Sequence, residues 1–301
     1  MNVATLQLLY TVETTLTLSL VTIGVYVSFR TLRFPDLTGE GSFSLSAMVA
    51  GGVLVASGSA WAATLAGVAT GAAAGAVTAI LANVVRLPTL LASILTMIMC
   101  VSLGLLIAGQ PSLTLPDSWV LATVLPDMNA ILATGIVGST LVLAVILFGL
   151  MALMYTGVGY VLRARGENPD LVNELKYSLL AWDIVGLALA NGVIGLAAVL
   201  FSQRAGYCSI NMGRGMAINA LAAIMLGETL FPSRTLLPAL LACVAGTLIL
   251  QLVRLLALSL GLPDGSLDLV TSVIVIVFVY VAKERGHIGQ NVLEKIRMHA
   301  A

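Results

Sequence analysis

Long apolar stretches separated by short polar gaps dominate this chain. Seven of them are nearly free of charge and centre on residues 6–29, 63–82, 90–108, 134–155, 184–201, 236–256 and 269–281. An α-helix rises 1.5 Å per residue, so about 20 apolar residues cross a hydrocarbon core of roughly 30 Å. The pattern therefore predicts a polytopic, all-α transmembrane bundle.

The positive charges orient this bundle. Eleven of the fourteen Lys and Arg residues fall in gaps on one side of it: Arg30, Arg33, Arg86, Arg163, Arg165, Lys176, Arg234, Lys283, Arg285, Lys295 and Arg297. Because cytoplasmic loops are rich in Lys and Arg, we expect an outside N-terminus and a cytoplasmic C-terminus. Parity then requires two further crossings, at 42–57 and 212–228, which are short or interrupted by glycine. About nine spans result, within a range of eight to ten.

Composition supports a membrane protein. Hydrophobic residues make up 59% and charged residues 9% of the chain, against about 25% charged in soluble proteins. Positive and negative residues are equal at fourteen each, so net charge does not suggest a nucleic-acid partner. No cation precedes the first apolar run, which argues against a cleaved signal peptide.

The two weak segments resemble each other. Gly39-Glu40-Gly41 aligns with Gly213-Arg214-Gly215, and small residues follow both. Five crossings separate them, so they enter from opposite faces. This pattern predicts inverted repeats, at about 6–156 and 181–283, each with a helix broken at membrane depth. A single transmembrane domain would thus fill residues 1–301, with a cytosolic segment at 160–180 and a cytosolic tail at 284–301.

Polar residues in and near these breaks are candidates for a translocation path, since irregular backbone at membrane depth is tolerated only inside protein or beside a wet cavity. The candidates are Asp36, Thr38, Glu40, Ser42, Asn191, Asn211 and Arg214. An alternative for the two acids is that they cap and charge the N-terminus of the following helix, within the headgroup region. The sequence leaves both interpretations open.

The longest polar stretch between spans runs from Arg163 to Lys176. Asn168 before Pro169 favours a helix start, with Asp170 in the first turn. Leu171, Leu175 and Leu179 would share one face at helical spacing. The stretch is either a short surface helix that docks on the membrane or on a cytosolic partner, or a plain connecting loop.

Catalytic and metal-binding patterns are missing from the sequence. It has no P-loop, serine elbow or HExxH motif, so we expect no enzyme activity and no cofactor in this chain. Transport driven by ATP would need its nucleotide site on another subunit. Cys100, Cys208 and Cys243 are expected to be small buried side chains. The stripe of Gly67, Gly71 and Gly75 is typical of close helix packing.

Several motifs together resemble a known family. They are Phe34-Pro-Asp-Leu-Thr-Gly-Glu-Gly-Ser-Phe43, Leu90-Leu-Ala-Ser-Ile-Leu-Thr-Met97, Arg163-Ala-Arg-Gly-Glu-Asn-Pro169, Val185-Gly-Leu-Ala-Leu-Ala-Asn-Gly192, Leu200-Phe-Ser-Gln203 and Asn211-Met-Gly-Arg-Gly-Met216. They look like the permease subunits of bacterial ABC importers of the branched-chain amino acid/ribose type. The tryptophan/tyrosine-type branch is the most similar, and the resemblance covers roughly residues 10–285.

The resemblance implies a type II ABC importer-like bundle in the bacterial inner membrane. Two permease copies would form a homodimer around the path, and a substrate-binding protein would deliver an amino acid or similar metabolite. An ABC ATPase, carrying ATP and Mg, would dock on the cytosolic segment through Arg163, Arg165, Glu167, Asn168, Pro169, Asp170, Glu174 and Lys176. Membrane lipid would surround the dimer, with no nucleic acid involved. Where many relatives continue this segment with Gly-Ile, this chain has Lys176-Tyr177.

Two other classes remain. An ion-coupled secondary transporter also has inverted repeats and buried charges, and would have to use Asp36, Glu40 or Glu228 as its coupling site. A non-transporting membrane scaffold would explain the glycine stripe but not the two opposed broken helices.

Overall fold

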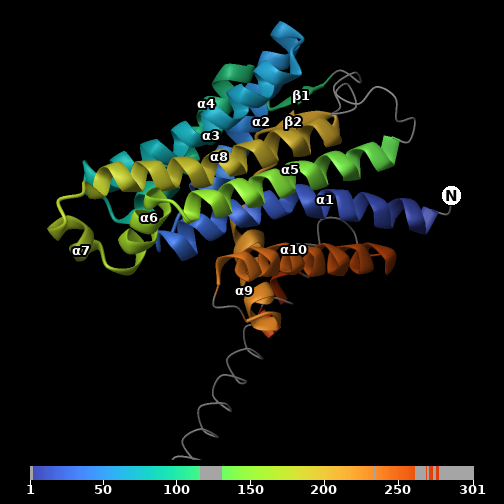
Figure 1. Cartoon of the computed structure of the whole chain (residues 1–301). Coiled ribbons are helices and arrows are strands. Elements are labelled where there is room, and N and C mark those ends of the chain that lie inside the picture. The colour runs from blue at the N-terminus through green and yellow to red at the C-terminus, as the bar shows by residue number, and fades with distance from the viewer. Residues whose placement is uncertain are drawn as a thin grey trace, which may run out of the picture.

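A computed structural model describes residues 3–115, 131–232 and 235–261, and residues 269, 271–273, 276 and 277. These residues form a helical bundle with one small pair of strands (Figure 1). The elements, with η1 a π-helical turn, are α1 (Val3–Tyr26), η1 (Val27–Thr31), α2 (Thr38–Ser57), α3 (Ala60–Asn83), α4 (Thr89–Ala108), β1 (Ser112–Thr114), α5 (Ile131–Met154), α6 (Gly157–Glu167), α7 (Pro169–Glu174), α8 (Leu179–Ala205), β2 (Tyr207–Ser209), α9 (Met216–Leu230) and α10 (Leu236–Ser259).

Seven helices in the described part of the chain are long and apolar enough to cross a membrane: α1 continued by η1, α2, α3, α4, α5, α8 and α10. The prediction of an all-α polytopic bundle is confirmed. The expected crossing at 212–228 is the 15-residue helix α9, which at 1.5 Å per residue is about 22 Å long and too short for a full span. Most of the expected crossing at 269–281 and the whole tail at 284–301 lie outside the described residues.

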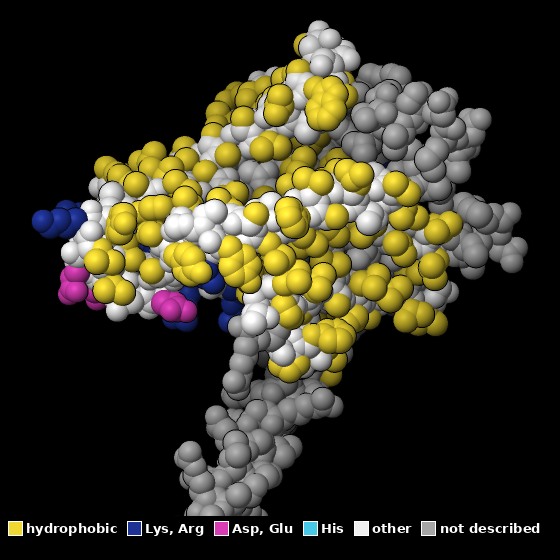
Figure 2. All heavy atoms as spheres, viewed as in Figure 1, with side chains coloured by type: hydrophobic (Ala, Val, Ile, Leu, Met, Phe, Trp, Pro, Cys, Tyr) yellow, Lys and Arg dark blue, Asp and Glu magenta, His cyan; other side chains and the backbone are white. Residues whose placement is uncertain are grey.

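Helix α1 occupies the middle of the bundle. Figure 1 shows α5 and α8 on one side of it and α9 with α10 on the other, and α1 contacts all four. Apolar side chains cover the flank seen in Figure 2, whereas the charged side chains gather at the end where α6 and α7 lie. We call this end the α7 end.

At the opposite end of the bundle, β1 pairs antiparallel with β2, with Leu113 opposite Cys208. We call it the β end. The pair ties the chain after α4 to the chain after α8. The sequence analysis predicted no strand here, because three-residue strands leave too little periodicity to be recognised.

Close packing of α3 against α8 builds the core, and the glycine stripe makes it possible. A Cβ atom at Gly71 would collide with the backbone carbonyl of Asn191, and one at Gly75 with that of Leu187. Gly67 faces the side chain of Val199 in the same way. The three glycines therefore serve helix packing, as their spacing predicted.

The bundle contains two irregular segments where the sequence predicted breaks. Residues 32–37 precede α2, and residues 210–215 precede α9. Thr38, the first residue of α2, follows Asp36, which contacts Asn191. Asn191 lies about 18 Å along α8 from its first residue, so α2 begins in the interior of the bundle. The inverted-repeat organisation, with boundaries at 6–156 and 181–283, stays a prediction.

Candidate functional site

Four of the predicted path residues form one hydrogen-bonded network around the start of α2. The carboxylate of Asp36 accepts the backbone N–H of Thr38 at 2.9 Å and the side-chain amide of Asn191 at 2.8 Å. Ser42 Oγ donates to Asn191 Oδ1 at 2.7 Å. A further bond of 2.7 Å joins the hydroxyls of Thr38 and Thr78. All of these side chains are at most 2% exposed, so the network is closed and internal.

Asp36 combines features of both interpretations offered by the sequence. It accepts the N–H of the first residue of α2, as a capping residue does. However, it is buried among α2 and α8 and does not lie at a surface beside Arg33, which is exposed. Its partners are neutral donors. Because a buried carboxylate is costly without such donors, Asn191 is essential to this arrangement.

Glu40 caps a helix other than its own. Its half-buried carboxylate lies close to the backbone N–H groups of Gly215, Ala217 and Ile218. These groups belong to the N-terminus of α9, where N–H groups lack partners within the helix and the helix dipole favours negative charge. The side chain of Arg214 adds a second favourable charge. Glu40 therefore fastens α9 to α2.

The segment before α9 is held against α2 and partly exposed. The N–H of Gly213 donates to Ser44 Oγ at 2.9 Å, and a Cβ atom at Gly213 would collide with the carbonyl of Glu40. Asn211 and Arg214 are exposed and are joined by a weak contact of 3.4 Å. The structure thus divides the seven candidates into an internal network and a surface group of Glu40, Asn211 and Arg214.

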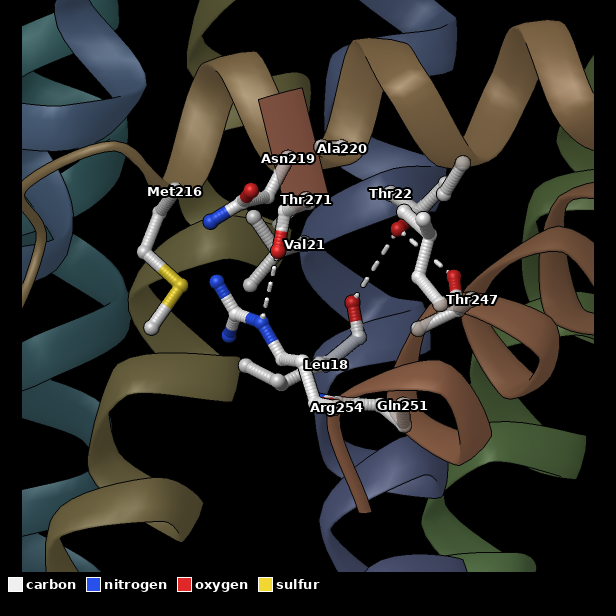
Figure 3. Close-up of a pocket in the computed structure, with 12 residues that line it drawn as sticks. Leu18, Val21, Thr22, Met216, Asn219, Ala220, Thr247, Gln251, Arg254 and Thr271 are labelled. Atoms are coloured by element: carbon white, nitrogen blue, oxygen red, sulfur yellow. Dashed lines mark hydrogen bonds between the residues drawn. The ribbon is translucent and has the colours of Figure 1, made fainter. Parts of the chain in front are cut away.

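A pocket lies between α1, α9 and α10, next to the first turn of α9 (Figure 3). It encloses about 380 Å³ of empty space, including the part open to the surroundings. Asn219, Arg254 and Thr271 converge in it, and Arg254 Nε donates to Thr271 Oγ1 at 3.4 Å. Its lining is Leu18, Val21, Thr22, Met216, Asn219, Ala220, Ala223, Thr247, Leu250, Gln251, Arg254 and Thr271.

The sequence analysis did not single out this pocket. Thr22 and Thr247 bond across it at 2.9 Å, but single hydroxyls in apolar runs carry no signal of a shared cavity. Asn219 stands one turn after the predicted break, which is the one sequence feature that pointed to it. None of the internal network residues lines the pocket.

At the α7 end, the predicted helix start is confirmed. Asn168 Oδ1 accepts the N–H of Leu171 at 3.1 Å, and Pro169 is the first helical residue. The predicted face of Leu171, Leu175 and Leu179 is wrong, because α7 ends at Glu174 and a turn separates it from α8. The contact with the bundle is made instead by Val172, which is 1% exposed.

The predicted ATPase-docking residues divide into exposed and anchored side chains. Glu167, Asp170, Glu174 and Lys176 are exposed. Arg163 instead donates to the carbonyl of Met154 at 2.8 Å and lies over the ring of Tyr160. Arg165 pairs with Asp183, a residue that no sequence pattern singled out.

Lys176 has a left-handed backbone, with φ of 60°. Glycine adopts this conformation without strain, whereas a residue with a Cβ atom is disfavoured there. The Gly that the resemblance implies for many relatives at this point would fit this conformation without strain. The turn is kept in this chain, since the N–H of Tyr177 bonds to the carbonyl of Val172 at 3.1 Å.

Cysteine and metal chemistry do not alter this description. Cys100, Cys208 and Cys243 are free and buried, as expected from the sequence. Within the described residues, no three His, Cys, Asp or Glu side chains gather in a way that could hold a metal ion.

Comparisons with known proteins agree with this architecture. Residues 7–282 match the family described as "Branched-chain amino acid transport system / permease component". The chain is 32% identical over 265 residues to the tyrosine transport system permease protein of Clostridioides difficile (strain R20291), covering 88% of this chain and 87% of that protein. It is 26% identical over 259 residues to the uncharacterized protein RP368 of Rickettsia prowazekii (strain Madrid E), covering 85% and 90%. No solved structure matches. A helical bundle with an exposed segment at one end and a match over nearly its whole length identify this chain as a member of the branched-chain amino acid transport permease family.

Proposed function

We propose that this permease works in an ATP-driven importer that carries an aromatic amino acid such as tyrosine across the bacterial inner membrane. The observation that carries the proposal is the exposed, charged segment of α6 and α7 at one end of an otherwise apolar bundle. A short helix held rigidly at the membrane surface suits the docking of a cytosolic motor. The name of the Clostridioides difficile relative supports the choice of solute.

In this proposal an ABC ATPase carries the ATP and Mg and contacts Glu167, Asp170, Glu174 and Lys176. The α7 end then faces the cytoplasm, and the N-terminus lies outside. A substrate-binding protein delivers the solute at the β end. The motor and the delivering protein each favour one of two arrangements of the permease.

A second permease copy completes the path. The surface group of half-buried Glu40 and exposed Asn211 and Arg214 faces the solute between the two copies. The internal network of Asp36, Thr38, Ser42 and Asn191 supports it from behind by holding the start of α2. The pocket beside Asn219, whose lining is mainly apolar, continues the path along α9. A passage with few polar groups binds solute weakly, which favours release.

Uptake of labelled L-tyrosine by proteoliposomes tests the proposal. They contain this chain together with its ATPase and binding protein. We expect uptake to require ATP inside the vesicle and to be unaffected when proton and sodium gradients are removed. Uptake by this chain alone under an ion gradient would refute the proposal. It would favour an ion-coupled secondary transporter acting through Asp36, Glu40 or Glu228, although Glu228 already pairs with Arg30.

A further inference from the structure

Asp183 joins three helices at the α7 end. It lies in the first turns of α8 and is 1% exposed. Arg165 of α6 contacts both of its oxygens: a terminal nitrogen donates to Oδ2 at 2.9 Å, and Nε lies 2.8 Å from Oδ1 without the alignment of a hydrogen bond. Asn83, the last residue of α3, donates to the same Oδ2 at 2.9 Å. The planar guanidinium beside both oxygens, together with the bond from Asn83, restricts the orientation of the Asp183 carboxylate as well as its distance.

The residue after Arg165 contacts the chain that leads to the internal network. Gly166 packs so tightly on η1 that a Cβ atom there would collide with the carbonyl of Thr31. From the other side, a Cβ atom at Gly186 of α8 would lie 3.0 Å from Leu32 Cγ. Helices α6 and α8 therefore both pack against residues 31 and 32. These residues lie at the end of η1, just before the segment that contains Asp36.

These contacts link α6, the segment of residues 31–36 and α8 to one another. Asp36 is bonded to Asn191, which lies about 12 Å beyond Asp183 along α8. The short segment from Thr31 to Asp36 thus bridges two fixed points on one helix. Because α8 is a rigid element, a displacement of α6 relative to it must be taken up in that segment and at the start of α2.

We propose that the Arg165–Asp183 pair is the joint through which a movement of α6 and α7 reaches the start of α2. The two residues act as positioning residues, not as contacts for solute or ATPase. This inference rests on the proposed function, which supplies the motor that moves α7. A fully exposed pair would be a weaker joint, because solvent and salt screen it and its side chains are not held in one geometry.

Two conservative variants test the joint in the reconstituted importer, with L-tyrosine as the transported probe. Arg165→Lys keeps the charge but loses the planar contact with both oxygens, and Asp183→Asn keeps the shape but loses the charge. For both we expect the ATPase to remain bound and to hydrolyse ATP, while uptake per ATP hydrolysed falls about tenfold, inside the roughly 5–150-fold range of coupling between sites. The double variant Arg165→Asp/Asp183→Arg, which exchanges the two residues, should recover part of the lost uptake per ATP hydrolysed.

The chain offers a matched control at the β end. There Arg204 of α8 pairs with Glu13 of α1, and Arg204 Nε lies 2.9 Å from the Glu13 carboxylate. The side chain of Arg204 is 28% exposed and that of Glu13 is 6% exposed. Arg204 lies about 32 Å beyond Asp183 along α8, at the end away from α6 and residues 31–36. Arg204→Lys and Glu13→Gln should lower thermal stability as the joint variants do, and should leave uptake per ATP unchanged.

The outcomes separate this inference from the proposed function. Arg165→Lys with an unchanged ratio of uptake to ATP hydrolysis overturns the joint. An equal fall in uptake per ATP hydrolysed in Glu13→Gln also overturns the joint, because the effect would then reflect stability alone. If the unmodified protein shows no ATP-dependent uptake, the proposed function fails. In that case a double-mutant cycle on thermal unfolding still shows whether Arg165 and Asp183 are energetically coupled.

Discussion

The carboxylate of Glu40, in the first turn of α2, lies close to the backbone N–H of Gly215, the residue that precedes α9. Two segments that the sequence marked separately as breaks thus meet at this side chain, and the bond from the N–H of Gly213 to Ser44 Oγ also joins them. The N–H groups of Ala217 and Ile218 share this carboxylate. Because these N–H groups have no partners within the helix, the acid supplies a negative charge that the helix end lacks.

Replacing Glu40 should destabilise the fold in a graded way. We expect Glu40→Gln to lose about 1–2 kcal/mol, since the charge leaves the helix N-terminus while an acceptor remains. Glu40→Ala should lose more, because the N–H groups are then left without a partner. Thermal unfolding of the purified protein in detergent measures both, with the exposed Glu167→Gln as control. Equal stability of Glu40→Ala and the unmodified protein would contradict the capping role.

Thiol labelling distinguishes the exposed path candidates from the internal network. Cysteine at Asn211 should react with a water-soluble reagent and be protected by solute. Cysteine at Ser42, which is fully buried, should react at least about tenfold more slowly. Each 1.4 kcal/mol of free energy needed to open the structure locally lowers the labelling rate about tenfold. The buried native cysteines give a low background. Rapid labelling at position 42 in the resting state would show that the network is open to water.

The exposed charges of α7 should matter for coupling and little for folding. Glu174→Ala with Lys176→Ala should lower uptake about fivefold or more, because both side chains are exposed at the docking segment. Stability should change by less than about 0.5 kcal/mol, as for other surface substitutions. Uptake and recovery of the ATPase complex are measured together with the unfolding temperature. If uptake and recovery both stay at their original levels, α7 is only a connecting loop.

The left-handed turn at Lys176 can be tested separately from its charge. Both Gly and Ala remove the ammonium group, but only Gly adopts φ of 60° freely. We expect Lys176→Gly to be more stable than Lys176→Ala by about 1 kcal/mol. Thermal unfolding of the two variants side by side gives the difference. A more stable Ala variant would mean that the turn adjusts to avoid the strained conformation.

Glycine positions in the bundle should respond in opposite directions to an added methyl group. Gly71→Ala should cost about 1–3 kcal/mol, because its Cβ would press on the backbone of Asn191. Gly149, in α5, has open space around it, so Gly149→Ala should gain about 0.5–1 kcal/mol through a less flexible unfolded chain. Unfolding temperatures provide the comparison. A neutral Gly71→Ala would mean that α3 and α8 can separate at little cost.

Features that depend on neighbouring residues could be predicted from the sequence. Spanning helices follow from the local density of apolar side chains, and the start of α7 follows from Asn168 and Pro169, whose effects act within one turn. The interruptions before α2 and α9 were visible for the same reason, since glycine and charge weaken an apolar run where they stand. The end of α7 was missed, because the leucine spacing continued through a turn that Lys176 makes in the conformation of a glycine.

The partners of the buried polar groups were decided by the tertiary structure alone. A sequence indicates that burying Asp36, Glu40 or Asp183 is costly, since an isolated charge in an apolar bundle is strongly unfavourable. It does not indicate which distant group offsets that cost. Asn191, the N-terminus of α9 and Arg165 take these roles because helix packing brings them next to the acids. Such contacts depend on how helices far apart in the chain lie against one another, and no local pattern contains that information.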